Sequence, residues 1–307
     1  MQLFRDIDAR PPSCAAVAIG NFDGVHLGHQ ALLQRAVELG DGAAAAISFE
    51  PLPIELFRPE QAPVRIQSTR ERIASLRDTG INVLWLARFN RRLASMAPVR
   101  FVSRFLVDGL GVRHVVVGGD FRYGARRSGD IDSLRAAGRA HGFTVHAQPE
   151  VRHDGQRVSS SRVRSALLDG DLELARALLG RRYSIGGRVT AGERLGRRLG
   201  YPTANLAMTR RDCPLRGIFA VRCQVHGEPQ MRDGVASVGY RPTVGGEALL
   251  LEVHLFDFEG DLYGRRLEVR FFARLREEAR FDNLESMTEQ MHRDAEQARQ
   301  ILSEYPV

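Results

Sequence analysis

A change in the pattern of apolar residues near residue 181 constrains the fold of this chain most strongly. Before it, short apolar runs typical of buried strands alternate with segments that have the spacing of amphipathic helices. This alternation predicts an α/β fold, a parallel sheet covered by helices on both faces. The predicted strands are residues 15–19, 43–49, 81–87, 112–117 and 144–147, and residues 70–79 and 98–106 are predicted helices.

After residue 181 the apolar segments are short and are separated by glycine and proline. They predict the antiparallel strands of a closed or nearly closed β structure. The predicted strands are residues 183–190, 217–225, 234–238, 249–258 and 267–273. A stripe of apolar residues at three- and four-residue steps from Leu284 to Leu302 predicts a terminal helix that packs on the core. We therefore predict two domains, residues 1–180 and residues 183–307.

Residues 20–29, Gly-Asn-Phe-Asp-Gly-Val-His-Leu-Gly-His, lie where the first predicted strand turns into a helix. Ligands of parallel sheets bind beyond the carboxyl ends of the strands, and a helix N-terminus favours an anion. Because histidines three residues apart share one helical face, His26 and His29 can reach the same phosphate. Two imidazoles there could stabilise the charge that develops on an α-phosphate during nucleotidyl transfer.

Two alternatives stand beside this interpretation of the histidine pair. The side chains could lie on a helix surface, or they could be metal ligands. A structural zinc site needs four ligands, and no cluster of cysteine or histidine lies close in the sequence.

Two later segments carry further phosphate-binding chemistry. Residues 117–124, Val-Gly-Gly-Asp-Phe-Arg-Tyr-Gly, lead from a strand into a glycine- and arginine-rich loop that can approach phosphates, although alone it could equally be a solvated loop. Residues 157–164, Arg-Val-Ser-Ser-Ser-Arg-Val-Arg, precede an apolar helical pattern. One serine there would act as a helix N-cap, but three serines among arginines predict a second phosphate site.

The second half contains a cationic loop in which Gly192 and Gly196 stand among arginines, a composition suited to covering phosphates. Pro202 follows and restricts the backbone before Thr203 and Asn205, whose hydroxyl and amide oxygens suit Mg²⁺ bound to ATP. The alternative is a hairpin loop that ends in a proline turn.

Glu252 lies within a predicted strand, where it shares one face with His254 while Leu251, Val253 and Leu255 share the other. A carboxylate on a strand can act as the general base for a primary hydroxyl. Considered alone, Glu252 could also be a solvated strand residue.

The motifs G-N-F-D-G-V-H-x-G-H, V-G-G-D-F-R-Y-G and V-S-S-S-R-V-R, in this order, resemble the FAD synthetase domain of bacterial bifunctional riboflavin kinase/FAD synthetases. These domains belong to the HxGH nucleotidyltransferase superfamily, so the resemblance implies a Rossmann-like fold in which His26 and His29 stabilise the transferring adenylyl group. The implied ATP- and phosphate-binding residues are Gly20, Asn21, Phe22, Asp23, Asp120, Arg157, Ser160, Ser161 and Arg162.

The motifs L-G-x-P-T-A-N-L, G-I-F-A-V, S-V-G-Y-R-P-T, L-E-V-H-L-F-D-F and D-L-Y-G resemble the riboflavin kinase domain, a β-barrel with a terminal helix. The resemblance covers nearly all of residues 183–307. It implies that Thr203 and Asn205 serve Mg²⁺-ATP and that Glu252 deprotonates the 5′-hydroxyl of riboflavin. The chain departs from the family at Ser237, where asparagine is common, and at Phe219, where tyrosine is usual.

Together the two halves predict a two-site enzyme. The barrel domain would phosphorylate riboflavin to FMN, and the α/β domain would transfer AMP from a second ATP to FMN, which yields FAD and pyrophosphate. Phosphoryl transfer depends on positioning and charge neutralisation, as sites rich in glycine, arginine and hydroxyl groups provide. Adenylylation of another substrate would leave the second half unexplained, and an arginine-rich RNA-binding protein would show salt-sensitive binding without ATP turnover.

The charge balance fits anionic small-molecule substrates. The net charge is +7, all 44 basic residues are arginine, and they are spread along the chain, so we expect no nucleic-acid partner.

No apolar run approaches the length of about 20 residues that a membrane span needs, and the N-terminus lacks a signal pattern. Three cysteines without close pairing indicate reduced thiols in the cytoplasm. The sequence leaves the oligomeric state open, a homo-oligomer included.

Overall fold

The computed structural model describes residues 1–6, 8–190, 201–208, 213–243 and 246–305. The chain forms two compact units. The first contains Met1–Pro63 and Thr69–Ser159, and the second contains Val64–Ser68 and Ser160–Val307. Each unit has its own sheet and its own core.

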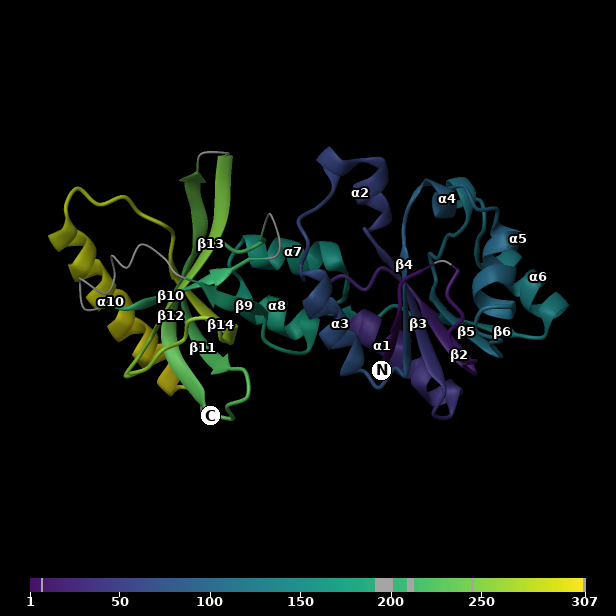
Figure 1. Cartoon of the computed structure of the whole chain (residues 1–307), viewed down its shortest axis with the longest axis horizontal. Helices are drawn as coiled ribbons and strands as arrows, with labels where there is room; N and C mark the ends of the chain where they lie inside the picture. The colour runs from purple at the N-terminus through teal and green to yellow at the C-terminus, as the bar shows by residue number, and fades with distance from the viewer. Residues whose placement is uncertain (7, 191–200, 209–212, 244–245, 306–307) are drawn as a thin grey trace. The chain divides into compact units, whose positions relative to one another are not determined.

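The first unit contains a six-stranded sheet in the order β1-β4-β3-β2-β5-β6, in which every pairing is parallel (Figure 1). β2 lies between β3 and β5, and the strand order runs in opposite directions on its two sides. The loops after β2 and β5 therefore meet at a switch point, where ligands of such sheets bind. The predicted parallel sheet is confirmed, although β1 was not predicted because it is too short to show a pattern. The strands are β1 (Gln2–Phe4), β2 (Ala16–Ile19), β3 (Ala44–Glu50), β4 (Val83–Arg88), β5 (His114–Gly118) and β6 (Thr144–Gln148).

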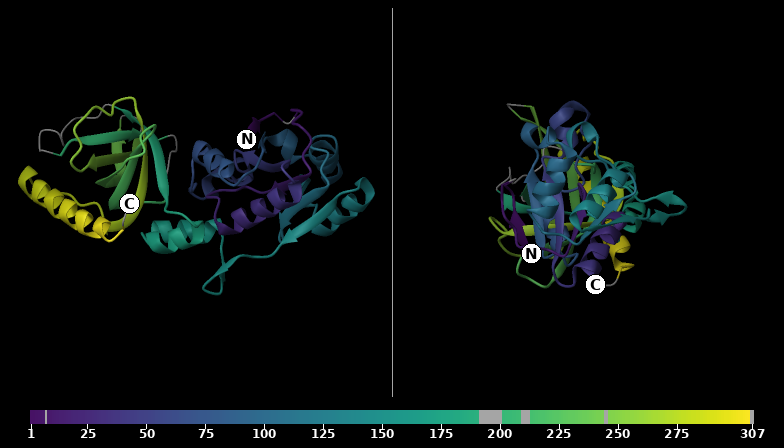
Figure 2. Two further views of the ribbon diagram at one scale, coloured as in Figure 1. Left: turned by 90° about the horizontal axis from the view of Figure 1, so that it is seen from below. Right: turned by 90° about the vertical axis from the view of Figure 1, so that its right-hand side faces the viewer.

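Helices cover both faces of this sheet (Figures 1 and 2). On one face α1 (Leu27–Gly40) and α3 (Thr69–Arg77) pack on small strand residues, and Gly40 approaches so closely that an added Cβ would lie 2.9 Å from Ala44 Cβ. On the other face lie α5 (Pro98–Phe101), the π-helical turn η2 (Val102–Val107) and α6 (Ile131–His141). Residues 98–106, predicted as one helix, therefore combine α5 with a π turn. The remaining elements are α2 (Pro53–Phe57), η1 (Pro59–Gln61), α4 (Arg91–Ala94), η3 (Ala125–Arg127), β7 (Arg152–His153) and β8 (Gln156–Arg157).

The second unit contains a closed antiparallel barrel in the order β10-β13-β12-β11-β14-β9. The predicted closed β structure is confirmed. β10 was not predicted as a strand, because polar residues interrupt its apolar pattern and only its pairing with β13 and β9 reveals it. The strands are β9 (Ser184–Thr190), β10 (Thr203–Ala207), β11 (Gly217–Val225), β12 (Met231–Thr243), β13 (Gly246–Leu255) and β14 (Arg266–Arg276).

Within the described part of the second unit there are three helices. α10 (Leu284–Ser303) lies along the outside of the barrel, where Ala298 and Leu302 pack with Phe256 and Phe272 (Figure 2). The prediction of a packing stripe is confirmed there, but Leu284 at its start is 56% exposed. α7 (Ser160–Leu168) and α8 (Leu172–Leu179) pack on each other, and α8 contacts β14.

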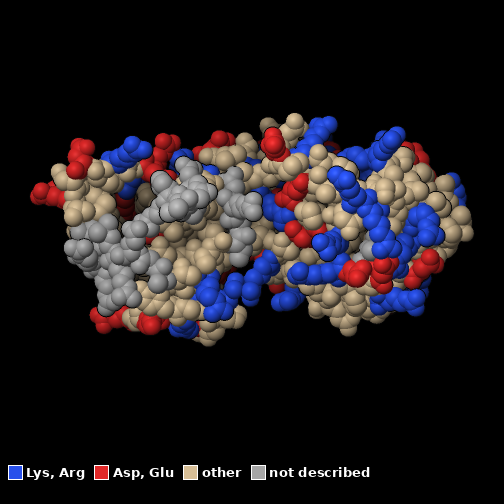
Figure 3. Space-filling view, turned by 45° about the horizontal axis from the view of Figure 1, so that its top comes forward, with Lys and Arg blue, Asp and Glu red and all other residues tan. Residues whose placement is uncertain are grey.

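Basic and acidic side chains are interspersed on the face of the molecule that Figure 3 shows. Within the described ranges, none of the helices has the length and hydropathy of a membrane span. Cys14, Cys213 and Cys223 are buried free thiols.

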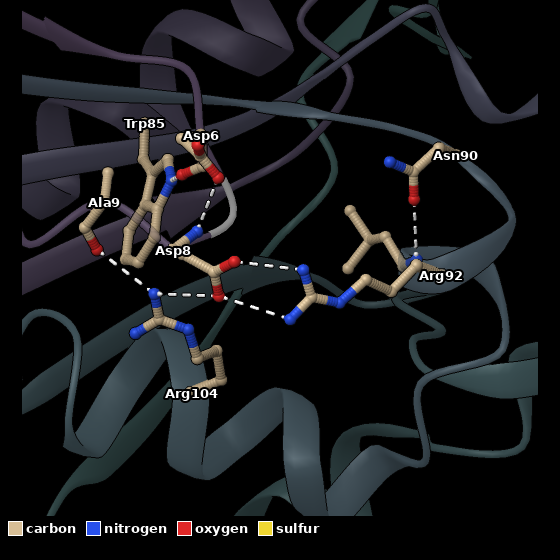
Figure 4. Close-up of polar contacts among 8 residues, drawn as sticks. Asp6, Asp8, Ala9, Trp85, Asn90, Arg92 and Arg104 are labelled. Atoms are coloured by element: carbon tan, nitrogen blue, oxygen red, sulfur yellow. Dashed lines mark hydrogen bonds and ion pairs between the residues drawn. The ribbon is translucent and has the colours of Figure 1, made fainter.

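The segment that follows β1 is held on the first unit by polar contacts (Figure 4). The Trp85 indole N–H donates to the Asp6 carbonyl at 2.9 Å. The Asp8 carboxylate accepts from Arg92 Nη1 at 3.0 Å and lies 3.8 Å from Arg104 Nη2. These contacts anchor the N-terminal segment beside β4, which explains how so short a strand joins the sheet edge.

Candidate active sites

The loop between β2 and α1 places both predicted catalytic histidines at a helix N-terminus. Its backbone is left-handed at Phe22 (φ 53°), Gly24 (φ 87°) and Val25 (φ 42°). His26 is the N-cap of α1, and its Nδ1 accepts a hydrogen bond from the His29 backbone N–H at 3.3 Å. Left-handed non-glycine residues cost of order 1 kcal/mol or more each and cluster at functional sites.

The two imidazoles are stacked, with ring centroids 3.7 Å apart and an interplanar angle of 17°. The fully buried ring of Phe22 lies edge-on to His29, with centroids 5.3 Å apart. A Cβ at Gly28 would lie 3.1 Å from the His26 ring, so glycine at this position leaves room for the stack. The prediction that both histidines share one face is confirmed, and Phe22 packs against His29.

The electrostatic surroundings keep His29 uncharged near neutral pH. Burial is the main cause that holds its pKa well below 6.5, and His26, Arg157 and Arg72 contribute in the same direction. His29 Nδ1 is buried and has no hydrogen-bond partner in the described chain. Because it is uncharged, His29 can supply one polarised N–H to a phosphate oxygen.

Across the described ranges, no group of three or more His, Cys, Asp or Glu is arranged to hold a metal ion.

A buried arginine that was not predicted, Arg72 of α3, joins the loops that follow β2 and β3. Its Nη1 donates to the Asn21 carbonyl at 3.0 Å, and its Nη2 donates to the Phe49 carbonyl at 3.1 Å and to Glu50 Oε2 at 2.5 Å. Ser48 Oγ also donates to the Asn21 carbonyl, at 3.1 Å. No sequence signal separates Arg72 from the exposed arginines of its helix.

Asp120 and Arg157, which were both predicted to bind ATP, form an ion pair in the first unit. Arg157 Nη1 lies 3.0 Å from Asp120 Oδ2 and 3.5 Å from Glu150 Oε1. The hydrogen bond from Arg157 is the main cause that lowers the pKa of Asp120. The other predicted phosphate ligands of this segment, Ser160, Ser161 and Arg162, begin α7 in the second unit.

In the barrel, neighbouring strands bring the predicted kinase residues together. Asn205 of β10 pairs directly with Glu252 of β13, and Thr203 pairs with His254. Directly paired residues of antiparallel strands project from the same face, so all four side chains share one face. Ser237 of β12 pairs with Glu252 from the other side. Leu251, Val253 and Leu255 are buried on the opposite face, as predicted.

The start of β10 is held by His254. A carbonyl can only accept, so His254 Nδ1 donates its proton to the Pro202 carbonyl, at 3.0 Å. Desolvation is the main cause that lowers the pKa of His254. Asn205 is 8% exposed, and its backbone carbonyl accepts a hydrogen bond from Thr190 Oγ1 at 3.3 Å.

A pocket of about 730 Å³ opens beside Thr203. Its lining includes Pro202, Thr203 and Val253 together with the turn at residues 258–263. Within this turn, Asp261 Oδ1 accepts from the Tyr263 N–H at 2.8 Å. Gly192 and Gly196 lie outside the described residues.

Comparison with known proteins assigns each half of the chain. The family model for FAD synthetase matches residues 9–162, and the model for riboflavin kinase matches residues 179–302. Bifunctional riboflavin kinase/FMN adenylyltransferase of Pseudomonas fluorescens is 49% identical over 308 residues, and that of Escherichia coli K12 is 42% identical over 307 residues. Each match covers 98% of both chains.

A crystal structure of a protein from Streptococcus pneumoniae, described as a macrolide-efflux protein, has the same fold with a TM-score of 0.83. It is 29% identical and covers 97% of this chain and 98% of its own. The chain therefore belongs to the bifunctional riboflavin kinase/FMN adenylyltransferase family, with the FAD synthetase domain N-terminal and the riboflavin kinase domain C-terminal.

Proposed function

We propose that this chain converts riboflavin to FAD in two ATP-dependent steps, each at its own site. The observation that carries the proposal is the presence of two separate constellations in a chain that matches both family models. One is the stacked His26–His29 pair at the start of α1, and the other is the Asn205–Glu252 pair on adjacent barrel strands.

In the adenylyl-transfer site, a phosphate oxygen of FMN attacks the α-phosphorus of ATP, and the bond to the bridging oxygen of pyrophosphate breaks. His26, His29 and the N–H groups that begin α1 stabilise the charge on the α-phosphoryl oxygens. Asn21 and Asp23 help to build the ATP site, with Gly20 and the Phe22 backbone shaping the loop. The side chain of Phe22 is fully buried, so its contribution is to position His29.

Arg157 changes partners in this proposal, from the Asp120 carboxylate to the triphosphate. Its exposed fraction of 48% supports this role, because an ion pair this exposed costs less than about 1 kcal/mol to open. Asp120 then becomes available to ATP. Ser160, Ser161 and Arg162 are proposed triphosphate ligands on the strength of the family resemblance.

In the kinase site, Glu252 removes the proton of the riboflavin 5′-hydroxyl as that oxygen attacks the γ-phosphorus of ATP and ADP leaves. Thr203 and Asn205 would hold Mg²⁺ together with the phosphates. Two neutral oxygen donors on one face suit a hard cation that retains water and phosphate ligands. When bound, Mg²⁺ would neutralise charge on the transferring group. His254 fixes the backbone at Pro202, immediately before these donors. Gly192 and Gly196 are proposed to cover the phosphates.

We assign the adenylyl-transfer function to residues 1–180 and the kinase function to residues 183–307. The FAD synthetase match ends at residue 162 and the riboflavin kinase match begins at residue 179, which supports a boundary in this region.

The three buried free thiols support a cytoplasmic location. Riboflavin, FMN and ATP are the proposed substrates, and the proposal involves neither a nucleic acid nor a membrane.

The direct test is to incubate the purified chain with riboflavin, ATP and Mg²⁺ and to follow flavins by chromatography. FMN should appear first and FAD should follow, with pyrophosphate released in the second step. If neither flavin product forms, the proposal is wrong.

A further inference from the structure

Arg72 occupies an unusual place for a cation, because its side chain is 2% exposed and lies at the carboxyl edge of the sheet. It extends from α3 to the ends of two neighbouring strands, β2 and β3. Its two terminal nitrogens reach the Asn21 carbonyl, the Phe49 carbonyl and the Glu50 carboxylate. Burying a cation is costly unless it is well paired, so these three acceptors account for its position.

The contact with Asn21 bears directly on the histidine pair. The Asn21 carbonyl accepts from both Arg72 and Ser48, and the next residue, Phe22, has the left-handed φ of 53°. The buried ring of Phe22 in turn supports His29, with ring centroids 5.3 Å apart. A continuous set of contacts therefore runs from the Arg72 guanidinium to the His29 imidazole.

We propose that Arg72 is a positioning residue for adenylyl transfer, which holds the Asn21–Phe22 turn so that His29 meets the α-phosphate. This inference rests on the proposed function of the first unit. Arginine is needed because its planar fork can bind two loops at once, whereas the ammonium of lysine is a single point charge. Charge alone does not meet this requirement.

The test compares Arg72→Lys and Arg72→Met with the same two changes at Arg77, an exposed arginine of the same helix. Displacement of a catalytic group by about 1 Å can cost about 100-fold in rate. We expect kcat for FMN adenylylation to fall by about 10- to 100-fold in both Arg72 variants, with a smaller change in KM for ATP. The Arg77 variants should match the wild type, and riboflavin phosphorylation in every variant should stay within about twofold.

A spectroscopic measurement separates positioning from folding. NMR of the imidazoles in the full chain should show altered His26 and His29 resonances in Arg72→Lys, while the kinase domain resonances remain. Ser48→Ala removes only a hydroxyl that donates to the same carbonyl, so it should lower the same kcat even if the Arg72 variants do not fold. The double variant Ser48→Ala/Arg72→Lys should lose less than the product of the single losses, because both donors act on one carbonyl.

Several outcomes would overturn the inference. One is a kcat for FMN adenylylation by Arg72→Lys that stays within about twofold of the wild type. Another is an equal loss of riboflavin phosphorylation in a folded Arg72 variant. If the Arg72 variants do not fold, an unchanged kcat in Ser48→Ala would overturn the inference. Failure of the proposed function looks different, because the wild-type chain itself would then not adenylylate FMN.

Discussion

At the residue scale, the proposed adenylyl-transfer site contains two stacked imidazoles, with ring centroids 3.7 Å apart. A positive charge on His29 is disfavoured in this stack, since His26 is one of the causes that lower the pKa of His29. His26 Nδ1 is already used as an acceptor, and the pKa of His29 is lowered by burial and by neighbouring cations. His29 is therefore suited to donating a hydrogen bond to an anionic phosphate while its imidazole is uncharged.

His29→Ala should remove FMN adenylylation and leave riboflavin phosphorylation intact. Removal of one donor to a developing oxyanion costs about 10²- to 10³-fold in kcat. The assay supplies FMN and ATP for one activity, and riboflavin and ATP for the other. Loss of both activities in a folded variant would contradict the assignment of His29 to one site.

Glu252→Gln should have the reverse effect. A general base contributes about 10²- to 10⁴-fold, and glutamine keeps the shape of the side chain without its basicity. We expect riboflavin phosphorylation to fall by that factor while FMN adenylylation continues. Full kinase activity in Glu252→Gln would exclude a general-base role.

His29 should also make the first unit less stable in acid. Its pKa in the folded chain lies well below 6.5, whereas in the unfolded chain it titrates near 6.5, so at lower pH the unfolded chain binds a proton that the folded chain does not. Well above pH 6.5, His29 is uncharged in both the folded and the unfolded chain, so it does not lower the free energy of unfolding there. As the pH falls further, the free energy of unfolding should decrease by up to about 1.4 kcal/mol per pH unit.

Denaturant titrations at about pH 7 and about pH 5 measure this difference. His29→Leu should flatten the pH dependence, because the leucine side chain does not titrate. His141→Leu is the matched control, since His141 is exposed at the end of α6. Identical pH dependence in wild type and His29→Leu would contradict the prediction.

At the scale of elements, an ion pair between the buried Asp294 of α10 and the partly buried Arg276 of β14 connects the helix to the barrel. Arg276 Nη2 lies 2.8 Å from Asp294 Oδ2, and Gln290 Nε2 donates to the same carboxylate at 2.8 Å. Asp294→Ala would leave the guanidinium largely buried without its carboxylate. We expect the free energy of unfolding of the second unit to fall by about 3–5 kcal/mol.

Glu289→Ala on the same helix is the control for that variant. Glu289 pairs with Arg293 at 3.4 Å, but both side chains are about two-thirds exposed. Its removal should change the free energy of unfolding by less than about 1 kcal/mol. Denaturant unfolding followed by circular dichroism distinguishes the two variants, and equal losses would show that the buried pair contributes no more than an exposed one.

Strand prediction succeeded where one pattern dominated an element. Residues 15–19 and 43–49 were predicted within one residue of β2 and β3, because buried parallel strands are continuous apolar runs. β10 was missed, since Thr203 and Asn205 face away from the core and break that pattern. The π turn in η2 was also missed, because the apolar spacing of residues 98–106 does not distinguish a π turn from a continuous α-helix.

At the scale of the whole molecule, the His26–His29 pair lies in the first compact unit and Glu252 lies in the second, so the two proposed activities should be separable between molecules. A mixture of His29→Ala and Glu252→Gln should make FAD from riboflavin, although neither variant alone should do so efficiently. The first variant supplies FMN, which diffuses to the second. If the mixture accumulates FMN without FAD, FMN made at one chain is not accessible to another.

The order of the motifs and the periodicity of apolar residues indicated two domains and their fold classes, and they led to the chemistry that we propose for His26, His29 and Glu252. These features are local, because a strand, a turn and a helix N-terminus are each specified by adjacent residues. Only the tertiary structure revealed Arg72 beneath Asn21, the Asp120–Arg157 pair and the direct pairing of Asn205 with Glu252. Each joins residues more than 30 positions apart. Such contacts depend on how strands and helices pack, which the spacing of residues along the chain does not specify.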